Sequence, residues 1–219
     1  MSTESLLLED TETVADLSVF LTRARAVEDG AALIEAAGNT LAVYVPVLYP
    51  ENIGEAVPTI IGMRAMALAE PSNVGGLFAL GALTDRLARM ATASDIRLEV
   101  PPAEVAASWA GQRVPRGGWT PVGSLSGEQL KAAADAGMEA VSKALPENAG
   151  KPVLRTVRSR IWSSPLEGSA LEIPTGMAFA AQALGFLGEG GESAVFESGR
   201  WLRISCSGGH VIARRASTF

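Results

Sequence analysis

Two short segments of this chain resemble each other, and they place the strongest constraint on its fold. One is ALIEAAGNTLAVYV, residues 32–45, and the other is AVFESGRWLRIS, residues 194–205. In each, apolar residues lead to a glutamate, then to a glycine turn, and then to a strand centred on leucine. Each also follows a segment with helical periodicity. We therefore predict two degenerate helix–strand–strand–strand units; the alternative to an internal duplication is a chance match between two common arrangements.

The first half of the chain is expected to form a helix followed by strands. The pair Gly38-Asn39 lies between two apolar runs, which indicates a hairpin of strands 31–37 and 40–48. For residues 59–69 we predict a strand from their short span between prolines, with a helix as the alternative that their alanine and methionine content favours. The other expected elements are a helix over 12–28 capped by Thr11 or Thr13, a loop over 51–58, a helix over 78–90 and a strand over 96–100.

The second half opens with a clear helix start. Ser126 and Gln129 have the spacing of a capping box, and the helix is expected to run to Leu145. The further elements are a helix over 152–163, a loop over 164–174, a helix over 176–187 capped by Thr175, and three strands with turns at Ser198-Gly199 and Gly208-Gly209. These patterns predict an α+β fold with a mainly antiparallel sheet and flanking helices.

The segment between the two halves contains two of the four tryptophans. Flexible linkers are rich in glycine and serine and have no reason to carry Trp109 and Trp119, each of which can bury roughly 150–250 Å². We therefore expect an ordered connecting strap over 101–125, between an N-terminal half, 1–100, and a C-terminal half, 126–219. All three parts are expected to form one compact unit.

Residues suited to nucleophilic or metal chemistry are sparse. The chain has one histidine, His210, and one cysteine, Cys206, on either side of the Gly208-Gly209 turn. A thiolate–imidazole pair or two metal ligands is one interpretation. We favour a packed thiol beside a tight turn, because zinc sites usually have four ligands. The glycine-rich residues 188–193 lack the lysine and hydroxyl of a phosphate-binding loop. We accordingly predict no catalytic residue, no metal and no cofactor.

Arginines are the better lead to a binding site, because guanidinium groups bind phosphate or carboxylate in a bidentate manner and stack on aromatic rings. Arg200 and Arg203 flank Trp201, and Arg214-Arg215 close the last strand. The candidate ligand-binding residues are Arg113, Arg116, Arg155, Arg158, Trp109 and Trp119. The alternative, which we favour, is that the arginines are exposed and pair with the acidic N-terminal half of the chain.

The charge of the chain argues against general binding to nucleic acid. Its formal net charge is −6, and proteins that bind the phosphate backbone need an excess of cations. The charge is uneven: residues 1–100 carry 14 acidic and 6 basic side chains, and residues 101–219 carry 10 and 12. The two halves are therefore able to attract each other, within a subunit or between subunits.

Several segments together resemble one protein family. They include LAVYVPVLYP, MRAMALAEP, ALTDRLARM, VPPAEVAASWAG, PRGGW and GMAFAAQALGFL. The resemblance covers most of the chain and is to an uncharacterised conserved family of high-GC Gram-positive (actinobacterial) bacteria. That family has no assigned activity, so the resemblance implies a stand-alone cytoplasmic protein but no catalytic residues.

The expected function is that of a non-catalytic binding or assembly protein in the cytoplasm that forms a homodimer and has protein partners. The acidic N-terminus predicts no signal peptide, and the apolar runs are too short to span a membrane. Two alternatives remain open. One is an enzyme or a binder of a small anionic ligand, with its site at the junction of the two halves. The other is a nucleic-acid-binding protein.

Overall fold

The computed structural model describes residues 4–52, 54–146 and 148–216. The chain divides into two compact units, Met1–Pro46 with Met63–Gln112 and Val47–Gly62 with Arg113–Phe219. Strands β2 (Ala31–Leu48) and β3 (Thr59–Ser72) contribute residues to both units. The boundary between units at 112 and 113 lies inside the strap that the sequence led us to expect.

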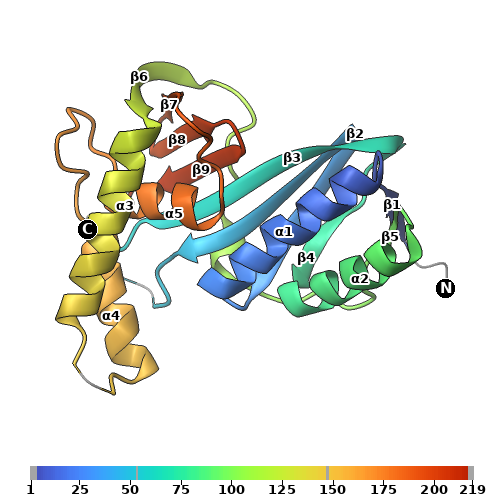
Figure 1. Ribbon diagram of the computed structural model, residues 1–219, viewed down its shortest axis with the longest axis horizontal. Coiled ribbons are helices and arrows are strands. Elements are labelled where there is room, and N and C mark those ends of the chain that lie inside the picture. The colour runs from blue at the N-terminus through green and yellow to red at the C-terminus, as the bar shows by residue number, and fades with distance from the viewer. Residues whose placement is uncertain (1–3, 53, 147, 217–219) are drawn as a thin grey trace. The chain divides into compact units, whose positions relative to one another are not determined.

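Each unit combines helices with antiparallel strands (Figure 1). The other elements of the first unit are β1 (Ser5–Leu7), α1 (Thr11–Val27), β4 (Gly75–Ala79), α2 (Leu80–Ala93), β5 (Arg97–Glu99) and the 3₁₀ helix η1 (Ser108–Gly111). Those of the second unit are β6 (Thr120–Ser126), α3 (Gly127–Ala144), α4 (Lys151–Trp162), α5 (Thr175–Ala183), β7 (Glu192–Ser198), β8 (Trp201–Cys206) and β9 (Gly209–Arg214). Within the described residues, no helix is both long enough and apolar enough to cross a bilayer.

The strands are hydrogen-bonded in the order β4-β2-β3-β9-β8-β7-β6, and β1 pairs separately with β5. The pairs β1–β5, β2–β4, β6–β7, β7–β8 and β8–β9 are all antiparallel. In the first unit α1 packs on α2, and in the second unit α5 packs on both α3 and β9. These findings confirm the expected α+β fold with a mainly antiparallel sheet and flanking helices.

The predicted hairpin of strands 31–37 and 40–48 is wrong, because β2 is one strand of 18 residues. Gly38 has a φ of 59°, as a turn residue would, yet the chain does not reverse there. Buried and less buried positions alternate with Ala32 and Ile34 buried before Gly38, and with Leu41, Val43 and Val45 buried after it, while both ends of the strand are buried at consecutive positions. One residue is therefore inserted into the alternation, as in a β-bulge with a left-handed glycine. The side-chain amide of Asn39 supports it by donating to the carbonyl of Leu68 at 3.0 Å.

Three helix starts show which capping predictions hold. The capping box of α3 is confirmed, since the Ser126 hydroxyl accepts from the Gln129 backbone at 3.1 Å and the Gln129 side chain accepts from the Ser126 backbone at 2.9 Å. The cap of α1 is Asp10 rather than Thr11 or Thr13, because its carboxylate accepts from the Thr13 backbone at 2.7 Å. Thr175 is the first residue of α5 rather than its cap, and its hydroxyl donates to the Ser164 carbonyl at 3.0 Å.

The strand over 59–69 and the three C-terminal strands are confirmed. The elements that the sequence did not predict are short: β1, β4, η1 and β6, the last of which forms the end of the expected strap. The order helix–strand–strand–strand occurs in both halves, as α1-β2-β3-β4 and α5-β7-β8-β9. The predicted internal duplication itself stays a prediction, and the glutamates of the two matched segments occupy different contexts because only the second segment forms a hairpin.

Trp162 is the packing centre of the three helices of the second unit. It is 3% exposed, and its ring stacks on Phe179 of α5 with centroids 4.5 Å apart. Gly137 of α3 allows the close approach, because a Cβ atom at that position would lie 2.2 Å from Cζ3 of Trp162. Gly176 of α5 plays the same part, with Ile60 at 2.7 Å from its virtual Cβ.

Candidate functional site

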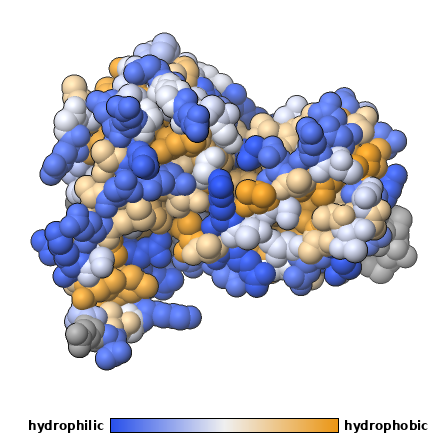
Figure 2. Space-filling model, viewed as in Figure 1, coloured by the Kyte–Doolittle hydropathy of each residue, from blue (hydrophilic) through white to orange (hydrophobic). Residues whose placement is uncertain are grey.

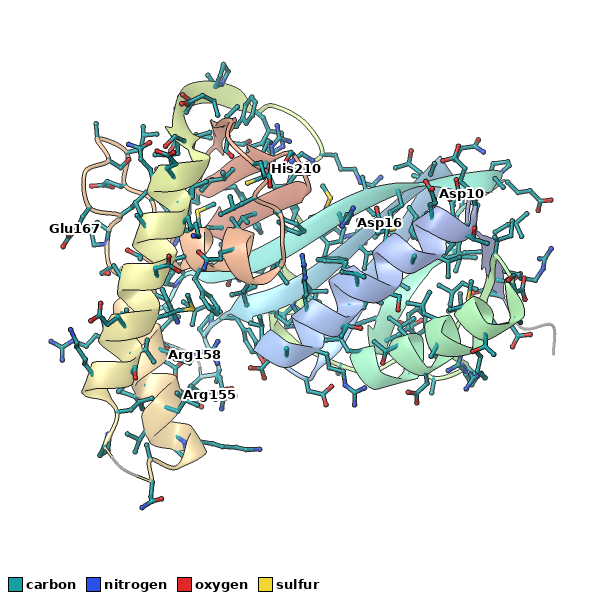
Figure 3. All side chains as sticks on the ribbon, viewed as in Figure 1. Asp10, Asp16, Arg155, Arg158, Glu167 and His210 are labelled. Atoms are coloured by element: carbon teal, nitrogen blue, oxygen red, sulfur yellow. The ribbon has the colours of Figure 1, made fainter. Side chains whose placement is uncertain are left out.

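One face of strands β7–β9 combines aromatic and basic side chains. The antiparallel register pairs Arg203 with Phe196 on one side and with Ile212 on the other, and it pairs Trp201 with Arg214 and Ser205 with His210. Because paired residues in adjacent strands share a face, these side chains lie together. We call this set the Arg203 face, which comprises Phe196, Trp201, Arg203, Ser205, His210, Ile212 and Arg214. Figure 3 shows His210 on this part of the sheet.

Arg203 lies over two aromatic rings at the centre of this face. Its Cζ atom is 4.5 Å from the ring centroid of Phe196 and 4.7 Å from that of Trp119. Both distances are typical of cation–π contacts. The indole N–H of Trp119 donates to the Pro115 carbonyl at 3.0 Å, which fixes the orientation of the ring. The sequence pattern predicts Trp119 as a ligand-binding residue but not Arg203, which lies two residues after Trp201.

The side chain of Arg203 has a buried polar atom without a partner in the described structure. Its Nε atom is buried and has no hydrogen-bond partner there, and no side-chain hydrogen bond or ion pair joins Arg203 to another described residue. Burial lowers the pKa of the Arg203 guanidinium from its usual value. The group nevertheless remains a cation at neutral pH.

His210 and Cys206 have different surroundings. Nδ1 of His210 lies 3.0 Å from the Ser205 hydroxyl, and burial, with the charge of Arg203 as the second cause, lowers the pKa of the imidazole. Cys206 follows Ser205 directly, so its side chain points to the opposite face of the sheet. Burial raises the pKa of its thiol. Within the described residues, no group of three or more His, Cys, Asp or Glu side chains is placed to hold a metal ion.

The six residues selected from the sequence lie in different places. Trp109 is buried in η1 of the first unit, and the other five belong to the second unit. Arg113 and Arg116 are exposed in the segment that leads to Trp119. Arg155 forms an ion pair with Glu51, and the Arg158 guanidinium lies 5.8 Å from the Phe179 ring centroid. Figure 3 shows Arg155 and Arg158 on α4, where both therefore have structural contacts.

A second feature of this unit is an apolar groove along α3. It has a volume of about 720 Å³, and small side chains of α3, among them Ala133, Ala136 and Gly137, line it. Leu166 and Glu167 of the segment after α4 form part of its other wall. Nearby apolar side chains are also exposed, with Met138 at 39% and Val153 at 45%, and Figure 2 shows apolar surface over α4.

Two family models match the sequence. Residues 1–111 match a family described as "Domain of unknown function (DUF8010)", and residues 114–218 match one described as "Domain of unknown function (DUF8185)". No curated protein sequence matches the chain.

Solved structures with a similar fold are bacterial DNA polymerase sliding clamps. The clamp of Bartonella birtlesii bound to griselimycin has a TM-score of 0.56 at 13% identity, covering 99% of this chain and 66% of the clamp. The clamp of Borrelia burgdorferi in complex with a natural product has a TM-score of 0.55 at 8% identity, covering 98% and 65%. The Helicobacter pylori clamp bound to a DNA ligase peptide has a TM-score of 0.50 at 10% identity, covering 99% and 66%. The chain thus spans about two thirds of the length of these clamps and shares their fold.

Proposed function

This chain belongs to the DUF8010 family, and we propose that it is a non-catalytic binding and assembly protein that forms a homo-oligomer, in the simplest case a homodimer, and binds protein partners. The observation that carries the proposal is the sliding-clamp fold, which extends over 98–99% of the chain in the Borrelia and Bartonella comparisons. A cytoplasmic location and an origin in high-GC Gram-positive bacteria are parts of the same proposal.

Polypeptide partners have direct support among the similar structures. The Helicobacter pylori clamp is bound to a peptide of a DNA ligase, so this fold can bind a short segment of another protein. The identity of 10% carries no binding residue over to this chain. We therefore transfer only the class of partner, a polypeptide.

DNA binding is a weaker candidate for this chain, although the similar structures are DNA polymerase clamps. Its formal net charge is −6. The helices α1, α2, α3 and α5 together carry six acidic and six basic side chains, so these four offer no excess of cations to a phosphate backbone. Helix α4 adds four basic and no acidic side chains, but two of them, Arg155 and Arg158, already contact Glu51 and Phe179. DNA binding would show a steep loss of affinity with salt, which a titration against duplex DNA by fluorescence anisotropy measures.

The two ends of the sheet are candidate contacts between subunits. Strands β4 and β6 end the hydrogen-bonded order of the described strands. The outer edge of β4 is partly occupied, because the Val105 N–H donates to the Leu77 carbonyl at 2.8 Å, so β6 has the more open edge. Such edges can pair with a second chain. On β6, Thr120 and Ser124 are exposed, whereas Pro121 and the register shift between Pro121 and Gly123 limit how much of the edge can pair.

Light scattering coupled to size-exclusion chromatography tests the proposal. We expect a mass of at least twice the 22.7 kDa of one chain over a wide range of concentration. Thr120→Glu with Ser124→Glu should weaken an assembly through β6 by like-charge repulsion. The matched control, Thr22→Glu with Thr92→Glu on exposed helix positions, should not. A strict monomer at all concentrations contradicts the homo-oligomer.

A further inference from the structure

We propose that Arg203, with the rings of Trp119 and Phe196 against its guanidinium group, is a binding site for a carboxylate group of a partner polypeptide. The inference rests on the proposed function, because it names the chemistry of the segment that such a partner would supply. The contacts of Arg203, the charge of its surroundings and the geometry left open to a ligand support it.

Other arginines of the described structure show what Arg203 lacks. Arg25, Arg64, Arg155 and Arg215 each form an ion pair with a carboxylate of this chain. Arg203 is partly buried like Arg64 and Arg215, yet no described residue supplies it with an acceptor.

The Nε atoms of Arg86 and Arg215 are buried without partners as well, so this property is not special to Arg203. The terminal nitrogens differ: Arg86 donates from Nη1 to the Ala82 carbonyl at 2.9 Å and Arg215 pairs with Glu197. Those of Arg203 have no acceptor in the described structure and are therefore available to a ligand.

The surroundings of Arg203 are positive. The neighbouring charged side chain on the Arg203 face is Arg214. The alternation along β7–β9 places one carboxylate on this face, that of Glu192. Glu192 lies four residues along β7 from Phe196, about 13 Å at the rise of a strand. The fixed charge next to Arg203 therefore favours an anionic ligand.

The geometry around Arg203 favours a carboxylate. Two rings lie within 5 Å of Cζ and the Nε atom is buried, which leaves the Nη atoms as the part of the guanidinium that a ligand can approach. These terminal nitrogens are not among the buried polar atoms that lack partners, so they reach solvent. A carboxylate can accept both N–H groups in the plane of the guanidinium.

A polypeptide is the source that fits this surface. The rings of Trp119, Phe196 and Trp201 offer apolar contacts to the residues on either side of an acidic side chain. A nucleic acid would need a longer track of cations, and the Arg203 face supplies two arginines. Arg113 and Arg116, exposed in the segment before Trp119, extend the positive surface by a short distance.

NMR spectroscopy of the ¹⁵N-labelled full chain tests the site. The signals of the Arg203 Nε–H and the Trp119 indole N–H are followed during titration with a synthetic peptide of alternating glutamate and glycine, with glutarate, with inorganic phosphate and with an oligothymidylate. We expect saturable shifts of both signals with the glutamate peptide and glutarate. Arg203→Gln should abolish the binding, and Arg203→Lys should weaken it by roughly tenfold, because the bidentate geometry is lost.

Arg160→Gln is the matched control, since Arg160 is an exposed arginine of α4 outside the Arg203 face. It should bind the peptide as the parent does. Equal binding by the parent and Arg203→Gln, or no shift with any carboxylate, overturns the site. So does tighter binding of phosphate or the oligothymidylate than of the glutamate peptide.

Light scattering on the same samples distinguishes a failure of the Arg203 site from a failure of the proposed homo-oligomer. If the protein is oligomeric but Arg203→Gln binds as well as the parent, the site fails and the proposed function stands. If the protein is a strict monomer that binds carboxylate through Arg203, the homo-oligomer fails and the site stands. Thermal melting of each variant establishes that a loss of binding does not arise from unfolding.

Discussion

Replacing Gly137 with alanine should destabilise the protein, although the same change usually stabilises a helix. Gly137 lies inside α3, where alanine in place of glycine normally gains about 0.5–1 kcal/mol. Here the added Cβ would lie 2.2 Å from Cζ3 and 2.7 Å from Cη2 of Trp162. Trp162 cannot move away easily, because it is 3% exposed and stacks on Phe179.

Overpacking of a close-packed core costs about 1–3 kcal/mol, and a virtual contact of this kind belongs at the upper end. After subtraction of the helix gain from about 3 kcal/mol, we expect a net loss of about 2–2.5 kcal/mol. For a chain of this length that corresponds to a fall in Tm of roughly 4–10 °C. Differential scanning calorimetry measures the shift, and urea titration followed by circular dichroism measures the free energy of unfolding.

Two further variants isolate the cause. Gly81→Ala is the matched control, because its Cβ would lie 3.6 Å from Arg25 in ordinary contact, so that variant should be neutral or slightly stabilised. Trp162→Phe removes the atoms that collide, and it loses no hydrogen bond, since the Trp162 N–H has no partner in the described structure. In the Trp162→Phe background, Gly137→Ala should be harmless. A rise in Tm for Gly137→Ala in the parent refutes the reasoning.

Three other predictions follow from single residues. His210 is the one histidine of the chain, so its imidazole signal can be titrated by NMR without overlap. Its pKa should lie below 6.5. The pKa should rise in Arg203→Gln, because the repulsion from Arg203 is lost. A lowered histidine pKa means that the unfolded state binds the proton more readily than the folded state, so this contribution to stability should decline as the pH falls below about 6.5. An unchanged His210 pKa in Arg203→Gln contradicts the role assigned to Arg203. Cys206 should react slowly with iodoacetamide at pH 8 in the folded protein and quickly in urea, because burial raises its thiol pKa; equal rates refute this. Ser126→Ala should cost about 1 kcal/mol in urea unfolding by removing the cap of α3, whereas Ser126→Asp, which can still accept the hydrogen bond, should cost less.

Local patterns predicted the elements whose residues interact with close neighbours in the sequence. The capping box of α3 spans three residues, and the buried stripe of α2, from Leu80 to Met90, repeats along one helix. The hairpin prediction at Gly38-Asn39 was wrong because a glycine–asparagine pair suits a chain reversal and a β-bulge equally. The choice depends on the pairing of β2 with distant strands, which the sequence does not reveal.

The Arg203 face could not be predicted from the sequence for a similar reason. The sequence places Arg203 two residues after Trp201, so both share one face if the segment is a strand. The rings that contact Arg203 belong to other parts of the chain. Trp119 and Phe196 approach Arg203 only after β6, β7 and β8 are placed next to one another. Arg155 and Arg158 were chosen as binding residues from their spacing on a helix. Their contacts with Glu51 and Phe179 depend on equally distant segments.

The inserted residue at Gly38 gives β2 two phases within one strand. Ala32 and Ile34 are buried before it, and Leu41, Val43 and Val45 after it. Deleting Gly38 would restore strict alternation along β2. The side chains of Leu41, Val43 and Val45 would then point to the opposite face of the sheet, toward solvent. Natural variants in this stretch should therefore gain or lose residues in pairs, while single substitutions at the exposed positions 37–40 are tolerated if Gly38 keeps its left-handed conformation.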